Sequence, residues 1–232
     1  RQFYTHNGIV PTSIMRAALQ QVTGSKVTTG GSTITQQLVK NEILGNRQQT
    51  LDRKANEIVN ALRLERYYSK DQILIAYLNS VYFYKGANGK HMYGVMAAAR
   101  GLFNKNAKDL TLPEAAYIAG MVQLPISYNP FSENKKQNIE RGKKRMKLVL
   151  NNMVVNKKIT AKQRDETLKY DITKSFAKSS DFSNAYATYP FVISAIESEA
   201  IKVLQEMDKK NNPSEAKERT TTICKRLSFN NL

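Results

Sequence analysis

Cysteine and histidine are almost absent from this chain of 232 residues. A single thiol, Cys224, cannot form an internal disulfide or a cysteine-rich metal site. With only His6 and His91 available, a zinc site is not expected either. Long apolar runs are missing as well, since none approaches the roughly 20 residues that a membrane-spanning helix needs. The chain begins without a Met or a signal peptide, so we expect a piece of a longer protein whose anchor lies elsewhere.

Negative charge is scarce. Asp and Glu together number 19 against 36 Lys and Arg, so the formal net charge is +17. This excess favours a polyanionic partner, which could be a nucleic acid, an anionic membrane surface or a phosphate-bearing substrate. The alternative is that the charge serves solubility alone. The content of hydrophobic residues, 41%, is ordinary for a globular protein and supports a packed core.

Apolar residues recur at helical spacing over most of the chain, so a mainly helical fold is predicted. Residues 125–130 are predicted to form an irregular segment bounded by prolines, and strand patterns are scarce before residue 185. A domain boundary is expected near residue 170, with residues 171–232 forming a polar linker that includes a charged helix at 193–209 and a strand seed at 220–223. Helices are predicted from Ile14, from Ser69 with Gln72 at the capping-box position, and over 33–43, 51–67, 93–102, 113–122 and 139–155.

The segment Gly30–Asn41 carries the sharpest pattern. Two glycines let the backbone approach a ligand, and the N-terminus of the following helix offers unpaired N–H groups to an anion. Thr33, Gln37 and Lys40 fall at i, i+4 and i+7, so they are predicted to project from one helix face. The alternative is a glycine turn, a Ser32 or Thr33 cap and a polar surface stripe.

A second pattern joins Arg53, Lys54 and Glu57 on one side of a predicted helix. Two cations at this spacing would keep Glu57 ionised or hold a diphosphate beside it. The alternative is an exposed ion pair that contributes about 0.3–0.5 kcal/mol.

Taken in order, these segments resemble the glycosyltransferase domain of class A penicillin-binding proteins and monofunctional peptidoglycan transglycosylases. That family opens with Glu-Asp-x-x-Phe-x-x-His-x-Gly, and Phe3, His6 and Gly8 match its second half. Its second motif, Gly-x-Ser-Thr-Ile-Thr-Gln-Gln, matches residues 30–37, and its third, Arg-Lys-x-x-Glu, matches residues 53–57. Residues 94–99 and 110–130 resemble the fourth and fifth motifs, so the resemblance covers about residues 1–165. The form of the insertion at 86–94 looks like the Gram-positive, streptococcus-like branch.

The resemblance implies a lysozyme-like fold with a small membrane-dipping subdomain, the glycosyltransferase domain occupying residues 1–170. It implies inverting transfer of a growing glycan chain from undecaprenyl diphosphate to lipid II, on the outer face of the cytoplasmic membrane. Glu57 takes the catalytic role at the leaving group. The implied partners are lipid II, moenomycin-type inhibitors, an anionic membrane surface and a cell-wall synthesis complex, and no nucleic acid is expected. The resemblance establishes no requirement for a cofactor, and Mg²⁺ or Mn²⁺ is an option at the diphosphate. The implied substrate-binding residues are Phe3, His6, Ser32, Thr33, Gln36, Gln37, Lys40, Asn41, Arg53 and Lys54.

The chain departs from the family at its N-terminus, where the Glu-Asp of the first motif would precede Arg1. That Glu is the family's general base, so residues 1–232 alone are expected to bind donor-like ligands without polymerising lipid II. Residues 220–223 resemble the strand that leads into the family's transpeptidase domain, so residues 171–232 are expected to be a linker toward that domain, which is absent here. The run after Cys224 does not continue the family pattern and looks like a truncation. The segment 8–15 is apolar, lies beside Arg16 and resembles the part of the family that dips into the lipid surface.

Two other functions compete with this assignment. A lysozyme-like hydrolase or lytic transglycosylase would need a carboxylic acid in a dry pocket, whereas Glu57 has cations beside it in the sequence. A basic nucleic-acid-binding module would fit the charge, but the basic residues are spread along the chain and no binding motif is present.

Overall fold

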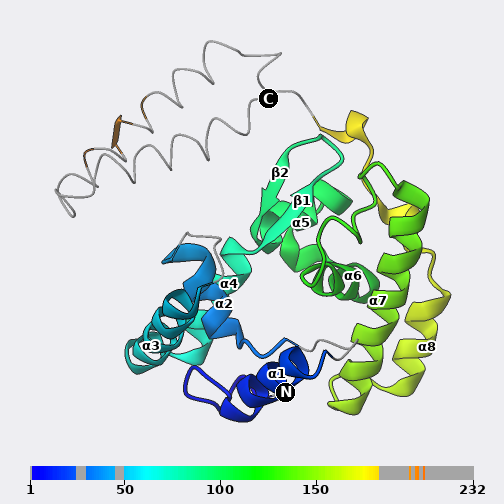
Figure 1. The fold of residues 1–232 in the computed structure, drawn as a ribbon. Helices are drawn as coiled ribbons and strands as arrows, with labels where there is room; N and C mark the ends of the chain where they lie inside the picture. Colours follow the sequence, from blue (N-terminus) through cyan, green and yellow to red (C-terminus); the bar gives the residue numbers. More distant parts are fainter. Residues whose placement is uncertain are drawn as a thin grey trace. The chain divides into compact units, whose positions relative to one another are not determined.

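The computed structural model describes residues 2–24, 30–44 and 50–182, together with residues 199, 202, 203 and 206. The chain divides into two compact units, the first formed by residues 1–82 and 93–96 and the second by residues 83–92 and 97–232. Helices dominate both units, as the sequence predicts (Figure 1). The elements are α1 (Pro11–Val22), α2 (Ile34–Glu42), α3 (Leu51–Tyr67), α4 (Lys70–Ser80), β1 (Tyr82–Lys85), β2 (His91–Tyr93), α5 (Gly94–Phe103), η1 (Ala107–Asp109), α6 (Leu112–Met121), α7 (Lys135–Val155), α8 (Ala161–Lys169), η2 (Ile172–Ser175) and η3 (Ser179–Asp181).

α2 and α4 begin where the sequence places their caps, whereas α1 begins at Pro11, ahead of the predicted Ile14, without a side-chain cap. Thr33 and Ser69 each form a capping box, in which the side chain of Gln36 or Gln72 accepts a hydrogen bond from the cap's backbone N–H. The hydroxyl of Thr50 caps α3 by accepting from the N–H of Arg53 at 3.2 Å. These bonds satisfy N–H groups that have no partner within the helix, each cap contributing about 1 kcal/mol.

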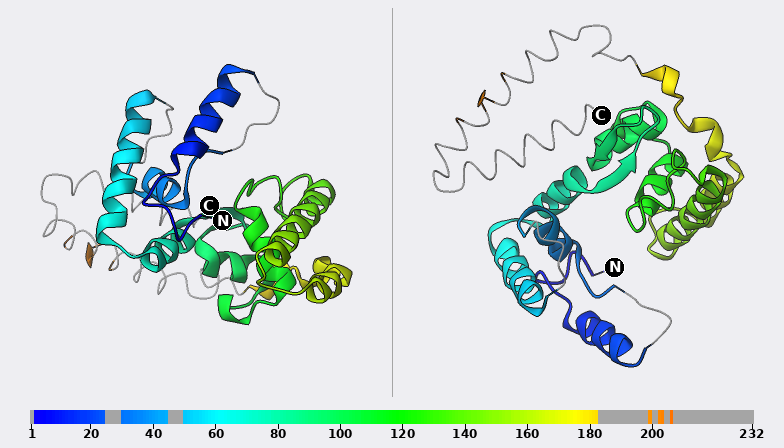
Figure 2. Two further views of the ribbon diagram at one scale, coloured as in Figure 1. Left: turned by 90° about the horizontal axis from the view of Figure 1, so that it is seen from below. Right: turned by 45° about the horizontal axis from the view of Figure 1, so that its top comes forward.

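The core of the first unit forms where α2 packs against both α3 and α4 (Figures 1 and 2). Leu38 and Val39 of α2 are buried there with Ala61 of α3 and Ile73 of α4. Burying such side chains contributes about 1.5–3 kcal/mol for each large aliphatic one. The sequence predicts Ile58, Leu62 and Leu64 on the apolar side of α3, and this is partly wrong, because Leu62 is exposed.

Two glycines permit close approaches in this unit. Gly8 has a φ of +92°, and a side chain there would lie 2.7 Å from the carbonyl oxygen of Ala61. A side chain at Gly31 would lie 2.9 Å from the carbonyl oxygen of Ser13, in α1. The segments that precede α1 and α2 therefore sit against neighbouring helices at distances that only glycine allows.

In the second unit, α6 packs along α7, and α7 along α8 (Figures 1 and 2). Tyr117 and Met121 of α6 are buried with Leu150 of α7. Gly142 brings the helices together, since a side chain there would meet the ring of Tyr117 at 2.7 Å.

Two features of the fold have no counterpart in the predictions. β1 and β2 form a two-stranded sheet around the glycine-containing loop 86–89, and α8 follows α7. A two-stranded hairpin of four and three residues is too short to show a clear alternating pattern. Among the residues described, no helix is long and apolar enough to cross a membrane.

The segment directly after α8 packs onto the second unit. Ile172 and Ala177 are buried, the N–H of Ala177 donates to the carbonyl of Leu102 at 2.8 Å, and Phe176 stacks on Phe103. The first residues of the predicted linker, up to Ala177, are thus part of this packed unit. The predicted strand at 220–223, Cys224 and most of the predicted helix at 193–209 lie outside the described residues.

Candidate active site

Residues from the first two motifs meet in the first unit. The hydroxyl of Thr33 donates to the carbonyl oxygen of Gly8 at 2.6 Å, across 25 positions of sequence. The same hydroxyl accepts from the N–H of Gln36 at 3.1 Å, and both side chains are buried. Thr33 and Gln36 therefore hold the start of α2 against the N-terminal segment, and their predicted contacts with substrate stay predictions.

Glu57 is the central carboxylate of this region. It lies in the second turn of α3, is only 2% exposed, and forms an ion pair with Lys54 three residues earlier. The Lys54 ammonium also donates to the hydroxyl of Ser32 at 3.0 Å, which links α3 to the segment before α2. The alternative of an exposed surface pair is wrong, because Glu57 is buried. A buried carboxylate needs a partner that offsets its desolvation, and Lys54 is that partner.

Two side-chain donors in the same motifs have no partner. The Nε of Arg53 and the Nε2 of Gln36 are each buried without a hydrogen-bond acceptor among the residues described. An unsatisfied buried donor costs about 1–3 kcal/mol, so such atoms call for an acceptor from a ligand or water. Arg53 is also free of any ion pair with Glu57, in contrast to the predicted three-residue cluster.

The predicted polar stripe on α2 is divided between two roles. Gln37 is half-buried and its side-chain oxygen accepts from the hydroxyl of Tyr77 on α4 at 3.1 Å. Burial raises the pKa of Tyr77, so this hydroxyl remains a donor. Lys40 and Asn41 are exposed on the last part of α2, and Lys40 forms no ion pair with any described residue. Of the stripe, Lys40 and Asn41 are the side chains open to a ligand.

A buried ionic cluster anchors the N-terminal segment, and the sequence interpretation missed it. Lys70, the first residue of α4, pairs with Glu65 of α3 at 2.7 Å and donates to the carbonyl oxygen of His6 at 2.5 Å. Glu65 accepts in turn from the hydroxyl of Thr35 at 2.6 Å. These partners are separated by up to 64 positions, so no local spacing pattern could have revealed them.

His6 and Phe3 take their places around Lys70. The Nδ1 of His6 accepts from the N–H of Gly8 at 2.9 Å and lies 3.2 Å from the Lys70 ammonium. Burial lowers the pKa of His6, and the positive charge of Lys70 lowers it further against the opposing effect of Glu65. A neutral imidazole is consistent with Nδ1 acting as an acceptor. The Lys70 ammonium also lies 5.0 Å from the ring centre of Phe3.

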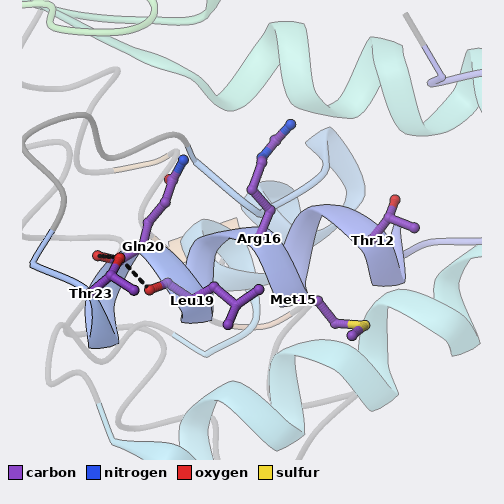
Figure 3. A pocket seen from close by; sticks show the side chains of 6 residues that line it. All are labelled: Thr12, Met15, Arg16, Leu19, Gln20 and Thr23. Carbon is purple, nitrogen blue, oxygen red and sulfur yellow. Dashed lines mark hydrogen bonds between the residues drawn. The ribbon is translucent and has the colours of Figure 1, made fainter.

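One face of α1 forms a shallow pocket with both polar and apolar walls (Figure 3). Met15 and Leu19 are 65% and 62% exposed, and Arg16 lies between them in the sequence. In the predicted membrane-dipping segment 8–15, Gly8 is buried and Ile9, Val10 and Ile14 are half-buried. Of the large apolar side chains described in residues 8–19, Met15 and Leu19, both on α1, are therefore the most exposed.

The donor set of the candidate site suits an anion better than a metal ion. The described residues contain no group of three His, Cys, Asp or Glu side chains that could hold a metal. Glu57 is already paired with Lys54, whereas Mg²⁺ prefers several oxygen ligands. Arg53, Lys54 and Lys40 provide cationic donors of the kind that bind phosphate.

Comparison with known proteins gives consistent matches. Residues 1–154 match the family described as Transglycosylase. Penicillin-binding protein 1A of Neisseria gonorrhoeae is 41% identical over 80% of this chain and 22% of its own length, and that of Aquifex aeolicus is 39% identical over 80% and 24%. The chain thus spans about a fifth of the length of these relatives. A crystal structure of penicillin-binding protein 1A from Haemophilus influenzae matches 79% of this chain and 20% of that chain, at 24% identity and a TM-score of 0.37.

Proposed function

The chain belongs to the transglycosylase family, and from this premise we propose that it is part of a protein that polymerises lipid II into the glycan strands of peptidoglycan. The glycan would be transferred with inversion at the anomeric carbon, and undecaprenyl diphosphate would leave. The observation that carries the proposal is the placement of Glu57. A buried carboxylate, ion-paired with Lys54 and linked through it to Ser32, lies in a unit that also brings the first two motifs together.

The chemistry of the leaving group explains the cations around Glu57. A diphosphate leaves readily only if its developing charge is stabilised, and fixed cationic donors do this best where water is excluded. Arg53 supplies a buried Nε with no acceptor, and Lys54 supplies an ammonium fixed by two partners. In our proposal Glu57 orients Lys54 toward the diphosphate.

Lys40 and Asn41 would extend this site along α2 toward the donor's phosphates and sugars. Both are exposed on the helix that carries Thr33 at its N-cap. We assign donor contacts to these two residues and to Gln37, and a supporting role to Thr33 and Gln36. Phe3 and His6 would support the acceptor side by fixing the segment that leads into the first motif.

The wider setting follows from the relatives. We propose that the parent protein is a class A penicillin-binding protein that works at the outer face of the cytoplasmic membrane, in a cell-wall synthesis complex. The exposed Met15 and Leu19 beside Arg16 would contact an anionic lipid surface there. We also retain the assignment to a Gram-positive, streptococcus-like branch, from the loop at 86–94, which a phylogenetic tree of complete family sequences would test.

A resident metal ion does not fit the candidate site. Its buried carboxylate Glu57 is committed to Lys54, so no step in our mechanism uses a metal. The dependence on Mg²⁺ or Mn²⁺ stays a prediction, tested by polymerisation in the presence of a chelator.

The rival hydrolase function receives no support from the geometry. A general acid of the lysozyme type lies in an apolar pocket without a neighbouring cation. Glu57 is instead in direct contact with the Lys54 ammonium.

A binding competition tests the proposal directly. Labelled lipid II in detergent micelles and labelled duplex DNA are titrated separately with the chain at physiological salt. We expect saturable binding of lipid II that a moenomycin-type phosphoglycolipid displaces. Retention of DNA without binding of lipid II would overturn the proposal in favour of the nucleic-acid function.

A further inference from the structure

The second unit contains a basic pocket that the proposed reaction does not use. It has a volume of about 520 Å³ and lies between the segment that follows α6 and one face of α7. Arg141, Lys144, Arg145 and Leu148 line it from α7, at the i, i+3, i+4 and i+7 positions of a single helix face. Leu124 and Tyr128 line it from the segment after α6.

The wall opposite α7 is held in place by hydrogen bonds from both helices. The hydroxyl of Tyr117, on α6, donates to the carbonyl oxygen of Tyr128 at 2.8 Å. The amide of Asn138, on α7, donates to the carbonyl oxygen of Ile126 at 3.2 Å. Both donors belong to buried residues, so the pocket is formed before any ligand arrives.

Its cations are not neutralised within the protein. No carboxylate lines the pocket, and Arg141, Lys144 and Arg145 form no ion pair with any carboxylate of the described residues. Glu140, beside Arg141 in the sequence, pairs with Lys143 instead, at 3.4 Å. Three unpaired cations on one helix face repel one another, so an anion placed among them would lower the free energy of the folded state.

Arg145 provides a second, independent indication of a ligand. A side chain added at Gly120 would lie 3.0 Å from the Cγ of Arg145, so the stem of this arginine runs closely over α6. Its Nε is buried and has no hydrogen-bond partner among the described residues. A buried donor in this condition costs about 1–3 kcal/mol unless an acceptor reaches it.

The apolar residues at the pocket indicate what carries the anion. Leu124 is 50% exposed and Leu148 is 47% exposed, and they line the same pocket as the three cations. A free inorganic anion would gain nothing from these side chains, whereas an acyl chain would bury apolar surface against them at about 25 cal/mol per Å². We therefore propose that this pocket binds the phosphate headgroup of an anionic lipid, with Arg141, Lys144 and Arg145 on the phosphate and Leu124 and Leu148 along the acyl chain.

The test uses the whole chain and a soluble short-chain lipid, and it does not depend on polymerisation. Dihexanoyl phosphatidylglycerol is titrated while the backbone amide signals are followed by NMR. Dihexanoyl phosphatidylcholine serves as the lipid without net charge and inorganic phosphate as the free anion. We expect saturable shifts for phosphatidylglycerol, centred on residues 123–128 and 141–148, with weaker binding of the other two.

Two double variants separate a site from diffuse charge, because each removes two positive charges from α7. Arg141→Ala with Lys144→Ala removes two cations that line the pocket, whereas Lys136→Ala with Lys147→Ala removes two exposed cations that do not line it. The first pair should weaken binding of phosphatidylglycerol about tenfold and the second less than about twofold. Thermal melting of each variant, followed by circular dichroism, confirms that it is folded.

Arg145→Lys is the conservative variant, since it keeps the charge and removes the Nε donor. We expect several-fold weaker binding without a fall in the melting temperature, since the variant removes a buried donor that has no partner. Equal losses in the two double variants, shifts confined to α1, or equal binding of inorganic phosphate and phosphatidylglycerol would each overturn the proposal.

Discussion

Replacing Glu57 by Gln tests whether the buried ion pair serves the reaction or only the fold. The substitution keeps the volume of the side chain and removes its charge. At 2% exposure, Glu57 has almost no contact with solvent, and its partner Lys54 also bonds to Ser32. Without the carboxylate, Lys54 keeps a partner but loses the charge that orients it.

The two roles predict losses in different quantities. If the pair stabilises a departing diphosphate, the polymerisation rate should fall about 10²–10³-fold, as for other fixed groups that stabilise developing charge. If the pair serves only the fold, the free energy of unfolding should fall by about 1–3 kcal/mol while the rate of the folded enzyme is retained. A domain with about 5–15 kcal/mol of stability remains folded after a loss of this size, so the polymerisation rate and the free energy of unfolding of the variant can both be measured.

The rate is measured with fluorescent lipid II in a chain that carries the Glu-Asp of the family's first motif ahead of Arg1. Glu114→Gln is the matched control. Glu114 is also buried and paired with a lysine, Lys105 at 2.7 Å, but it lies in the second unit. We expect the control to lose stability and keep its rate, whereas the Glu57 variant loses its rate.

Near-normal polymerisation by the Glu57→Gln variant would refute its assigned role. An equal loss of rate in the control variant would also refute it, since any buried ion pair would then have the same effect.

Three further predictions follow from the described residues. Lys40→Ala should weaken binding of a moenomycin-type inhibitor about tenfold in a fluorescence titration, whereas Arg66→Ala, which removes an exposed charge from α3, should have less than a twofold effect; equal losses would contradict a localised site. Met15→Ser with Leu19→Ser should abolish the salt-resistant part of binding to anionic vesicles in a flotation assay, because salt screens charge but not apolar burial; unchanged binding at high salt would refute this. Glu114 should make the free energy of unfolding depend on pH in the acid range. Burial alone would raise the pKa of Glu114, but hydrogen bonds from Lys105 and Thr111 outweigh burial and lower this pKa. The stabilisation by the Glu114 carboxylate is therefore present above the ordinary pKa of 4.5 and is lost as the pH falls below that value. Denaturant unfolding of wild type and Glu114→Gln should therefore differ at pH 7 and converge in acid, and a constant difference would show that the charge is not responsible.

The parts of the structure that the sequence predicted are those that depend on neighbouring residues. Caps at Thr33 and Ser69 were predicted and are confirmed, because a cap bonds to residues two or three positions away. The contact between Lys54 and Glu57 was predicted for the same reason, since positions i and i+3 share a helix face.

Interactions between distant segments could not be predicted in this way. The spacing of Glu65 and Lys70 gives no reason to expect that both contact the N-terminal segment around His6. The boundaries of the two units, among them those after residues 82 and 96, could not be predicted either, because they fall inside a hairpin and a helix. The burial of side chains on α3 was also predicted incorrectly in part. Leu62, predicted on the apolar side of this helix, is exposed, whereas the charged Glu57 is buried.

The segment Gly30–Asn41 shows why a motif alone does not tell which of its residues meet a ligand. Its polar side chains are all of types that could bind phosphate or sugar, and the spacing places Thr33, Gln37 and Lys40 on one helix face. In the structure, the first half of the segment supports the fold, because the Thr33 hydroxyl donates to the carbonyl oxygen of Gly8 and Thr33 caps α2 together with Gln36. In the second half, Lys40 and Asn41 are exposed, whereas Leu38 and Val39 are buried in the core. The two halves depend on each other, since Lys40 can meet a diphosphate beside Arg53 only if α2 is held at a fixed angle to α3. Substituting a residue of the first half should therefore reduce stability and ligand binding together, whereas substituting Lys40 should reduce binding alone.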